Sequence, residues 1–315
     1  MRRAPRWRGV LVLNYHRIGD HAAQPWDHTL WSASAAALDA QLAVLASEAE
    51  VIGPGDVEAA MSSGRRGRRV MLTFDDGYRD NFELAYPLLR RHGLTATFFL
   101  ATGFLDRPHV AWWDELAWMV RRAHADELPP SEWLPSGLAL NDATQETAIA
   151  AIVARYKSLP SNRAEAFLDD VAAATGSGRC EGGEAGGLWM TWEMAREMYT
   201  NGMTIGGHTV THPVLSQIPP ESQEQEISGC AQRLEQELGE PMRWFAYPVG
   251  SPDSFTADTE RMLRERGVEL AFSFYGGLAR FRHWSSLNVP RADIGQAHSP
   301  RVLRTMLWFP SRLVR

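Results

Sequence analysis

Two short segments of the sequence carry residues that could bind a metal ion. Asp75 and Asp76 close the apolar run at residues 70–74. Far downstream, His208 and His212 stand four residues apart, a spacing that one helical turn would place on a single face. Two imidazoles and one carboxylate form a common ligand set for zinc. The residue types therefore indicate a divalent-metal site with a second carboxylate beside it.

Each segment also has a plainer interpretation. An Asp-Asp pair before glycine is often a solvated turn. A His-x-x-x-His pair is often a solvated helix end, here limited to about one turn by Pro213. The combination is more informative, because both segments follow short apolar strands, at 70–74 and 203–205, and both break at glycine. Sites at the carboxyl ends of parallel strands can converge.

Length, charge and cysteine content limit the class of protein. The 315 residues are 44% hydrophobic and 10% aromatic, which suits an ordinary globular chain, either one barrel-sized domain with an insertion or two domains. A formal net charge of -6 argues against a general nucleic-acid binder, since such proteins need a basic face. The two cysteines form no Cys-x-x-Cys pair, so we expect neither a disulfide framework nor a cysteine-rich metal site.

The ends of the sequence bear on location. Residues 1–8 are basic, but the apolar run at 9–13 is too short for a signal-peptide core, and no run is long enough for a membrane span. We therefore expect a cytoplasmic protein, at most peripheral to the inner membrane. Residues 301–315 mix apolar side chains with arginines, which fits either weak contact with a membrane surface or a terminal helix docked on the core.

The periodicity of apolar residues predicts an α/β fold. Helical patterns alternate with short β-rich runs, and glycines separate them. The expected helices are 81–92, 220–238 and 257–266, and the strands that follow them are 95–100, 242–246 and 268–274. Such repeated units give a parallel sheet, open or closed as a barrel. Residues 105–188 show only helical patterns, at 113–122, 143–157 and 163–174, and we interpret them as a helical insertion.

Two motifs carry a resemblance to a known family. The segments Thr73-Phe74-Asp75-Asp76-Gly77 and His208-Thr209-Val210-Thr211-His212-Pro213 resemble the first two motifs of the NodB-type polysaccharide deacetylases, a carbohydrate esterase family. The resemblance covers roughly residues 10–104 and 188–294. It implies an irregular (β/α) barrel of fewer than eight parallel strands, within a single catalytic domain at 1–315 that contains the 105–188 insertion.

The resemblance also implies a division of roles. Asp76, His208 and His212 would hold the metal, and Asp75 would be the general base. An amide is a poor electrophile, so the reaction needs a metal that polarises the carbonyl and activates water. Zinc is the expected cofactor, with cobalt or nickel as alternatives, because ligand preferences overlap among these ions.

The third motif departs from the family pattern. The family usually carries Arg-x-Pro-aromatic, in which the arginine orients the base, but this chain has Ala246-Tyr247-Pro248-Val249. Arg291 lies in a Pro-Arg element that resembles the exopolysaccharide-operon branch of the family, and we expect it to replace the missing arginine. A surface position for Arg291 is the alternative. The backbone N–H of Val249 would help to hold the oxyanion.

The general acid requires a further assignment. The family usually takes it from a Leu-x-His near the C-terminus, whereas here Leu11-Val12-Leu13-Asn14-Tyr15-His16 resembles that motif moved to the N-terminus. A circular permutation permits this move, since the first and last strands of a barrel are neighbours. We therefore assign His16 as the acid, with a core histidine bound to backbone groups as the alternative. Expected substrate contacts are Tyr247, Trp113, Asp114 and Trp189.

These features predict a metal-dependent hydrolase that removes an N-acetyl group from an N-acetylated sugar. The substrate would be a polysaccharide, an oligosaccharide or a lipid- or nucleotide-linked precursor in exopolysaccharide or glycolipid assembly. Two alternatives stay open: hydrolysis of another small amide on the same scaffold, and a non-catalytic carbohydrate-binding protein. The sequence leaves the sugar and the oligomeric state undetermined.

Overall fold

The chain divides into two compact units in a computed structural model that describes residues 6–281 and 283–310. The barrel unit comprises the residues up to Gly19, Leu30–Arg107 and the residues from Trp189 onward. The helical unit comprises Asp20–Thr29 and Pro108–Leu188. The helical unit therefore includes a short N-terminal segment besides most of the predicted insertion at 105–188.

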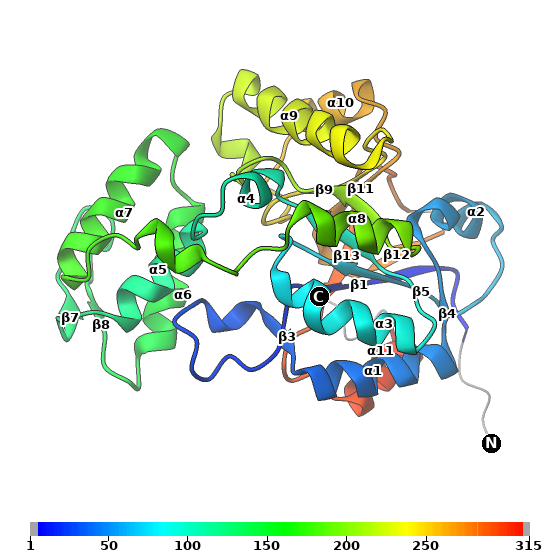
Figure 1. The fold of residues 1–315 in the computed structure, drawn as a ribbon, viewed down its shortest axis with the longest axis horizontal. Helices are drawn as coiled ribbons and strands as arrows, with labels where there is room; N and C mark the ends of the chain where they lie inside the picture. The colour runs from blue at the N-terminus through cyan, green and yellow to red at the C-terminus, as the bar shows by residue number, and fades with distance from the viewer. Residues whose placement is uncertain (1–5, 282, 311–315) are drawn as a thin grey trace. The chain divides into compact units, whose positions relative to one another are not determined.

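Seven parallel strands of the described residues close a barrel (Figure 1). Around the barrel they follow the order β1-β13-β11-β10-β9-β6-β5, and β5 pairs again with β1. Their bounds are Gly9–Tyr15 (β1), Arg69–Phe74 (β5), Thr97–Leu100 (β6), Thr204–Gly207 (β9), Trp244–Ala246 (β10), Leu270–Gly276 (β11) and Val289–Asp293 (β13). The prediction of a (β/α) barrel with fewer than eight strands is confirmed.

Shorter strands extend the sheet or pair outside it. β12 (Leu278–Arg280) runs antiparallel to β1, and β4 (Glu50–Val51) runs parallel to β5. β2 (Arg17–Ile18) pairs with β3 (Trp31–Ala33) just after β1. These additions leave the carboxyl ends of the seven barrel strands at one end of the barrel.

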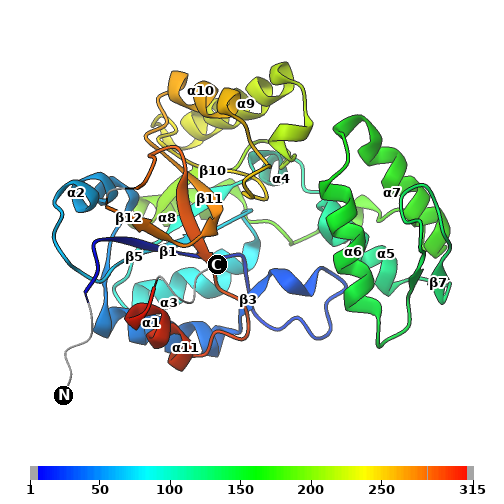
Figure 2. The ribbon, with the colours of Figure 1, turned by 180° about the vertical axis from the view of Figure 1, so that it is seen from behind.

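Helices cover the outside of the barrel. In both views, α1, α3 and α11 lie on one side of the sheet, and α9 and α10 lie on the opposite side (Figures 1 and 2). The helix bounds are Ala35–Glu48 (α1), Val57–Ser62 (α2), Tyr86–Arg91 (α3), Thr102–Asp106 (α4), Trp192–Thr200 (α8), Pro220–Leu238 (α9), Ala257–Glu265 (α10) and Pro300–Trp308 (α11). A π-helical turn, Asn81–Ala85, precedes α3.

The pattern of β1 shows why the barrel strands are almost wholly apolar. All seven of its residues are buried, because one face meets the helices and the other faces the barrel interior. Leu11 and Leu13 belong to the larger core cluster, which includes residues of the surrounding helices. Val10 and Val12 belong to a second cluster, built largely from other barrel strands. Successive side chains of β1 point to opposite faces of the sheet, so the strand contributes to both hydrophobic clusters.

The glycines of β9 are required for close packing. The sequence pattern predicted a strand that breaks at Gly206, but β9 continues through Gly207. A Cβ at Gly206 would lie 2.8 Å from the carbonyl oxygen of Trp244, and one at Gly207 would lie 2.9 Å from Sγ of Cys230. The two glycines therefore let α9 and β10 approach the strand instead of ending it.

The C-terminal helix packs on the core. α11 buries Leu303, Met306 and Leu307 in the larger core cluster, which fits the docked terminal helix foreseen as one alternative. Residues 311–315, the rest of the segment considered for membrane contact, lie outside the described residues. Among the described helices, none combines the length and the apolar character needed to cross a bilayer.

The helical unit has its own packing. Its helices are α5 (Trp112–Arg121), α6 (Gln145–Lys157) and α7 (Ser161–Thr175), and α5 packs against both of the others. The prediction that this region has no strands is wrong, because β7 (Glu127–Leu128) pairs antiparallel with β8 (Leu138–Ala139). These strands have only two residues each, too few for a period-two pattern to be visible in the sequence.

Candidate active site and metal centre

The candidate site lies at the carboxyl end of the barrel strands. Asp75 and Asp76 directly follow β5, His208 directly follows β9, and His16 directly follows β1. Arg291 lies within β13, the neighbour of β1 on the side away from β5. Because parallel strands all end on the same side, residues far apart in the sequence meet here.

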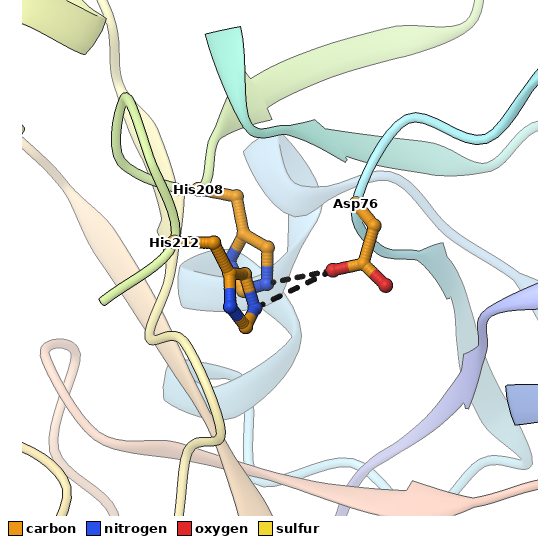
Figure 3. Close-up of side chains that lie close together, drawn as sticks. All are labelled: Asp76, His208 and His212. Carbon is orange, nitrogen blue, oxygen red and sulfur yellow. Dashed lines mark ion pairs between the residues drawn. The ribbon is translucent and has the colours of Figure 1, made fainter. Parts of the chain in front are cut away.

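Three side chains converge as a metal-ligand set would (Figure 3). Oδ1 of Asp76 lies 3.4 Å from Nε2 of His208 and 3.4 Å from Nε2 of His212. One ligand atom from each of the three residues falls within 4.8 Å of the others, and all three residues are buried. Such separations match the edges of a tetrahedral site whose metal–ligand bonds are about 2.0–2.2 Å long.

The hydrogen bonding of His208 suits this geometry. Its Nδ1 donates to the carbonyl oxygen of Ala246 over 2.7 Å, which fixes the tautomer and leaves Nε2 turned toward Asp76. Burial opposes protonation of His208, but the carboxylates of Asp75 and Asp76 outweigh it and raise the pKa of this imidazole. Burial, together with the nearby His208, lowers the pKa of His212 to about 3, so its ring is neutral as a metal ligand requires.

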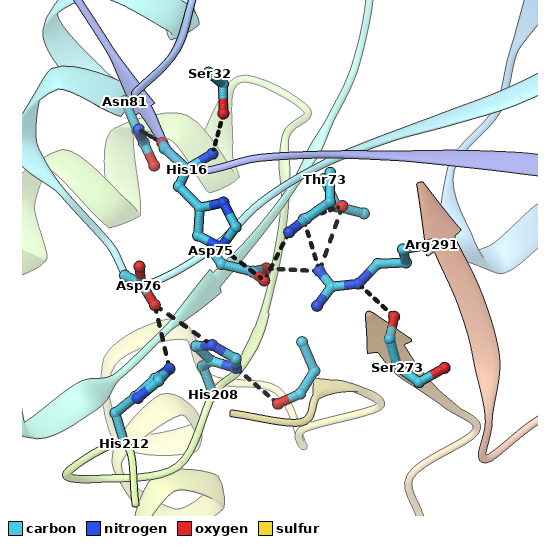
Figure 4. A network of polar contacts seen from close by, with 12 residues as sticks. His16, Ser32, Thr73, Asp75, Asp76, Asn81, His208, His212, Ser273 and Arg291 are labelled. Carbon is cyan, nitrogen blue, oxygen red and sulfur yellow. Dashed lines mark hydrogen bonds and ion pairs between the residues drawn. The ribbon is translucent and has the colours of Figure 1, made fainter. Parts of the chain in front are cut away.

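Two partners hold the Asp75 carboxylate, and Figure 4 shows one of them, Arg291, against it. Nη1 of Arg291 donates to Oδ1 over 2.7 Å, and Nδ2 of Asn14 donates to Oδ2 over 3.0 Å. Burial alone would raise the pKa of Asp75, but the Arg291 guanidinium and His208 hold it well below its usual range. The carboxylate is therefore ionised and fixed in orientation.

Arg291 is itself buried and donates hydrogen bonds to several groups. Only 1% of its surface is exposed, so the alternative of a surface arginine is wrong. Its Nε donates to the carbonyl oxygen of Ser273 over 3.0 Å, and Nη1 also donates to Oδ1 of Asn14 over 2.7 Å. These bonds aim the guanidinium at Asp75, the contact predicted for the missing motif arginine.

Asn14 was not singled out from the sequence, yet it links the network. Its Oδ1 accepts from Arg291 and, over 2.6 Å, from Oγ1 of Thr73, which leaves Nδ2 to donate to Asp75. The two donors to Oδ1 fix the orientation of the amide. The sequence did hold one indication of a functional role for Asn14, because it is a polar residue inside a largely apolar strand.

His16 reaches the same end of the barrel from β1. Its Nε2 lies 4.0 Å from Oδ2 of Asp75, and 15% of its side chain is exposed. The edge of its ring contacts Phe274, with the ring centroids 5.4 Å apart. The main chain of His16 is anchored on both sides, since its N–H donates to Oγ of Ser32 and its carbonyl accepts from Nδ2 of Asn81. The imidazole thus lies beside Asp75 and is partly exposed.

Unusual backbone conformations gather at this site. In the part of the chain that the structure describes, four non-glycine residues have positive φ: Asp76 (75°), Thr209 (69°), His212 (58°) and Val249 (62°). The conformation is costly for any side chain and most so for the β-branched Val249 and Thr209. Two of the four are metal-ligand candidates, a third lies between the two histidines, and the fourth is the predicted oxyanion residue.

The two histidines are not brought together by a helix. We expected a single helical turn, but residues 208–212 form an irregular loop after β9. The positive φ at Thr209 and His212 turns the chain back on itself, and the ring centroids of the histidines lie 4.7 Å apart. The two imidazoles are therefore close together, as predicted, but an irregular loop and not a helical turn brings them there.

The predicted substrate contacts have varied surroundings. Tyr247 is 1% exposed, stacks on Phe255 and donates its hydroxyl hydrogen to the carbonyl oxygen of Leu287 over 2.7 Å, so its side chain is buried and not placed to contact a substrate as predicted. The sequence pattern could not distinguish a buried tyrosine from one that is exposed at the site. Trp189 is 3% exposed and stacks between Tyr78 and Phe104, so it too packs in the barrel unit.

Trp113 and Asp114 belong to the helical unit. Trp113 is buried, and Oδ1 of Asp114 accepts from the backbone N–H of Asp27 over 2.9 Å. The carboxylate thereby ties α5 to the N-terminal segment of its own unit. Contact of these two residues with a substrate stays a prediction, as does the oxyanion role of the Val249 N–H.

The protein is thus a closed parallel barrel that carries a candidate divalent-metal centre, the buried cluster of Asp76, His208 and His212, at the carboxyl end of its strands. The family model for polysaccharide deacetylase matches residues 62–128 and 160–271, more than half of the chain. The chain therefore belongs to the polysaccharide deacetylase family, and the predicted family, with its class of amide-cleaving hydrolases, is confirmed. The matched residues include Asp75, Asp76, His208 and His212 but not His16 or Arg291.

Individual proteins resemble the chain in sequence or in structure. The putative polysaccharide deacetylase YxkH of Bacillus subtilis is 45% identical over 40 residues, which span 13% of this chain and only 14% of that relative. The Streptococcus pyogenes deacetylase PplD, solved in complex with acetate, superposes with a TM-score of 0.63 at 19% identity, covering 95% of this chain and 98% of that one. IcaB from Ammonifex degensii superposes with a TM-score of 0.60 at 18% identity, covering 96% and 98%. The structural likeness supports the fold.

Proposed function

We propose that this protein is a metal-dependent hydrolase that removes the acetyl group from an N-acetylated sugar. Family membership supports the deacetylase class. The observation that carries the proposal is the separation of two carboxylates: Asp76 faces two imidazoles, whereas Asp75 is held away from them by Arg291 and Asn14. Such a division provides a ligand and a base from adjacent residues.

The donor set fits a divalent cation such as zinc, cobalt or nickel. Asp76, His208 and His212 would hold it, with one carboxylate oxygen and two imidazole nitrogens that leave room for further ligands. When bound, the cation would polarise the amide carbonyl and lower the pKa of a water molecule. The tautomer fixed at His208 supports this assignment, because its Nε2 is available for coordination.

The remaining residues account for the proton movements. Asp75, ionised and oriented by Arg291, accepts a proton from the attacking water as its oxygen bonds to the carbonyl carbon. His16 donates a proton to the sugar nitrogen as the carbon–nitrogen bond breaks. The backbone N–H of Val249 stabilises the carbonyl oxygen, which becomes negative after the attack of water and before the carbon–nitrogen bond breaks. The products are acetate and the amino sugar: the proton that Asp75 takes up restores the one that His16 gives, and the acid proton of the acetyl product passes to the amine.

The substrate is an N-acetylated polysaccharide, an oligosaccharide or a lipid- or nucleotide-linked precursor. The test is acetate release from N-acetylglucosamine monomers and oligomers by purified protein, before and after chelation and after addition of zinc or cobalt. We expect release that stops on chelation and returns with metal. Cleavage of linear or cyclic ureides without release from sugars would favour another amide substrate. Sugar binding without acetate release in the metal-loaded protein would favour a binding protein.

A further inference from the structure

The loop that carries the two histidines is strained and needs support. It leaves β9 at Gly207 and brings His208 and His212 into one cluster without forming a helix. Thr209 and His212 adopt positive φ, a conformation that is unfavourable for residues with a side chain. A loop of this kind keeps its shape only where the surrounding structure supplies partners for its peptide groups.

Glu226 supplies a charged partner from outside the loop. It lies on α9, and its Oε2 accepts from the backbone N–H of Val210 and of Thr211, each over 2.8 Å. Its Oε1 accepts from Oγ1 of Thr211 over 2.6 Å. One carboxylate therefore binds two consecutive peptide groups and one side chain in the segment between the histidines. Hydrogen bonds to an ionised acceptor are shorter and stronger than neutral ones.

The opposite face of the loop is held by backbone groups. The N–H groups of Thr102 and Gly103, at the start of α4, donate to the carbonyl oxygens of Thr209 and Val210 over 3.1 and 2.8 Å. A Cβ at Gly103 would lie 2.7 Å from the Val210 oxygen, so only glycine permits this approach. The loop is therefore clamped between α4 and the Glu226 carboxylate.

We propose that Glu226 is a positioning residue that sets the affinity of the site for a divalent cation. It acts by holding residues 210 and 211, which fixes the turn that brings His212 to Asp76. Without the carboxylate, two N–H groups lose their acceptor and the strained turn can relax. The inference rests on the metal site proposed above.

The experiment compares Glu226→Ala with Glu224→Ala. Glu224 lies on the same helix and pairs with the exposed Arg266, so its removal controls for loss of a helix carboxylate. Zinc affinity is measured by titration calorimetry on metal-free protein. We expect affinity to fall about 10- to 100-fold in Glu226→Ala, to fall less in Glu226→Gln, and to stay unchanged in Glu224→Ala. Thermal unfolding establishes that all variants fold.

A second measurement separates this inference from the metal proposal. Hydrogen exchange of the Val210 and Thr211 amides is followed by NMR in metal-free protein, where it reports the order of the loop alone. We expect exchange to accelerate in Glu226→Ala and not in Glu224→Ala. Unchanged exchange, or equal zinc affinity in the two variants, overturns the role of Glu226. Failure of the unaltered protein to bind zinc overturns the metal proposal, and the exchange rates still decide whether Glu226 holds the loop.

Discussion

Nη1 of Arg291 lies 2.7 Å from Oδ1 of Asp75, although 216 positions separate the two residues in the sequence. The pair joins β13 to the end of β5 across β1, and both side chains are buried. The contact gives Asp75 a fixed orientation and a stable negative charge. The third motif of this chain, Ala246-Tyr247-Pro248-Val249, lacks the family's usual arginine, and Arg291 makes the contact to Asp75 that was predicted for a replacement.

Removal of Arg291 is expected to destabilise the protein strongly. In Arg291→Leu the Asp75 charge stays buried without its ion partner, a situation that costs about 3–5 kcal/mol. Urea denaturation measures the change in the free energy of unfolding. Arg243→Leu is the control, since Arg243 pairs with Glu269 at the surface, where such pairs contribute about 1 kcal/mol or less. Equal losses in the two variants would refute a special role for the buried pair.

Asp75→Asn is expected to remove turnover and leave the metal in place. The amide preserves the shape of the side chain but cannot accept the proton, so kcat should fall about 10²- to 10⁴-fold. Zinc content measured by atomic emission should match that of the unaltered protein. Asp253→Asn, at an exposed carboxylate bonded to Ser251, provides the control. Loss of zinc together with activity would mean that Asp75 is a ligand and not the base.

Asn14→Leu is expected to affect kcat more than KM. Without the amide, Oδ2 of Asp75 loses its donor and the carboxylate can rotate, and a misplacement of this kind can lower kcat by up to about 100-fold. Gln41→Leu is a matched control, because Gln41 is a buried amide that contacts the neighbouring Tyr15 and not Asp75. Steady-state kinetics of both variants give the comparison. A similar fall of kcat in Gln41→Leu would assign the effect to general destabilisation.

The thiol of Cys180 is expected to be unreactive near neutral pH. Burial, together with Glu115, raises its pKa to about 12, so the thiol is protonated at pH 8 and becomes thiolate only as the pH approaches that value. Alkylation by iodoacetamide, followed by mass spectrometry, should be at least about tenfold slower than for a free cysteine at pH 8 and should rise steeply above pH 10. Rapid labelling at pH 8 would contradict this environment.

The convergence of Asp76 with the two histidines could be predicted because each segment follows an apolar strand. The local path of the histidine loop could not, since it depends on partners from α4 and α9 that are distant in sequence. The His-x-x-x-His spacing favours a helical turn when considered alone. Tertiary hydrogen bonds to Val210 and Thr211 instead support an irregular loop with positive φ.

The barrel was predictable where its helices are strongly amphipathic, as in Pro220–Leu238, for which the predicted and observed bounds agree. Ala35–Glu48 was not predicted, because six of its fourteen residues are alanine and blur the contrast between its faces. The burial of Tyr247 could not be predicted either, since its hydroxyl donates to the carbonyl oxygen of Leu287, which lies 40 positions away. Arg291 was identified only through a family resemblance, and its bonds to Asn14 and Ser273 required the fold.

The most direct test of the metal centre is anomalous X-ray diffraction at the zinc edge from crystals of the protein grown with zinc. A metal-dependent deacetylase of the proposed kind should show a strong peak bounded by Oδ1 of Asp76 and Nε2 of His208 and His212, with Asp75 outside the coordination sphere. A peak at another place, a peak coordinated by Asp75, or no peak in zinc-saturated crystals would contradict the proposal.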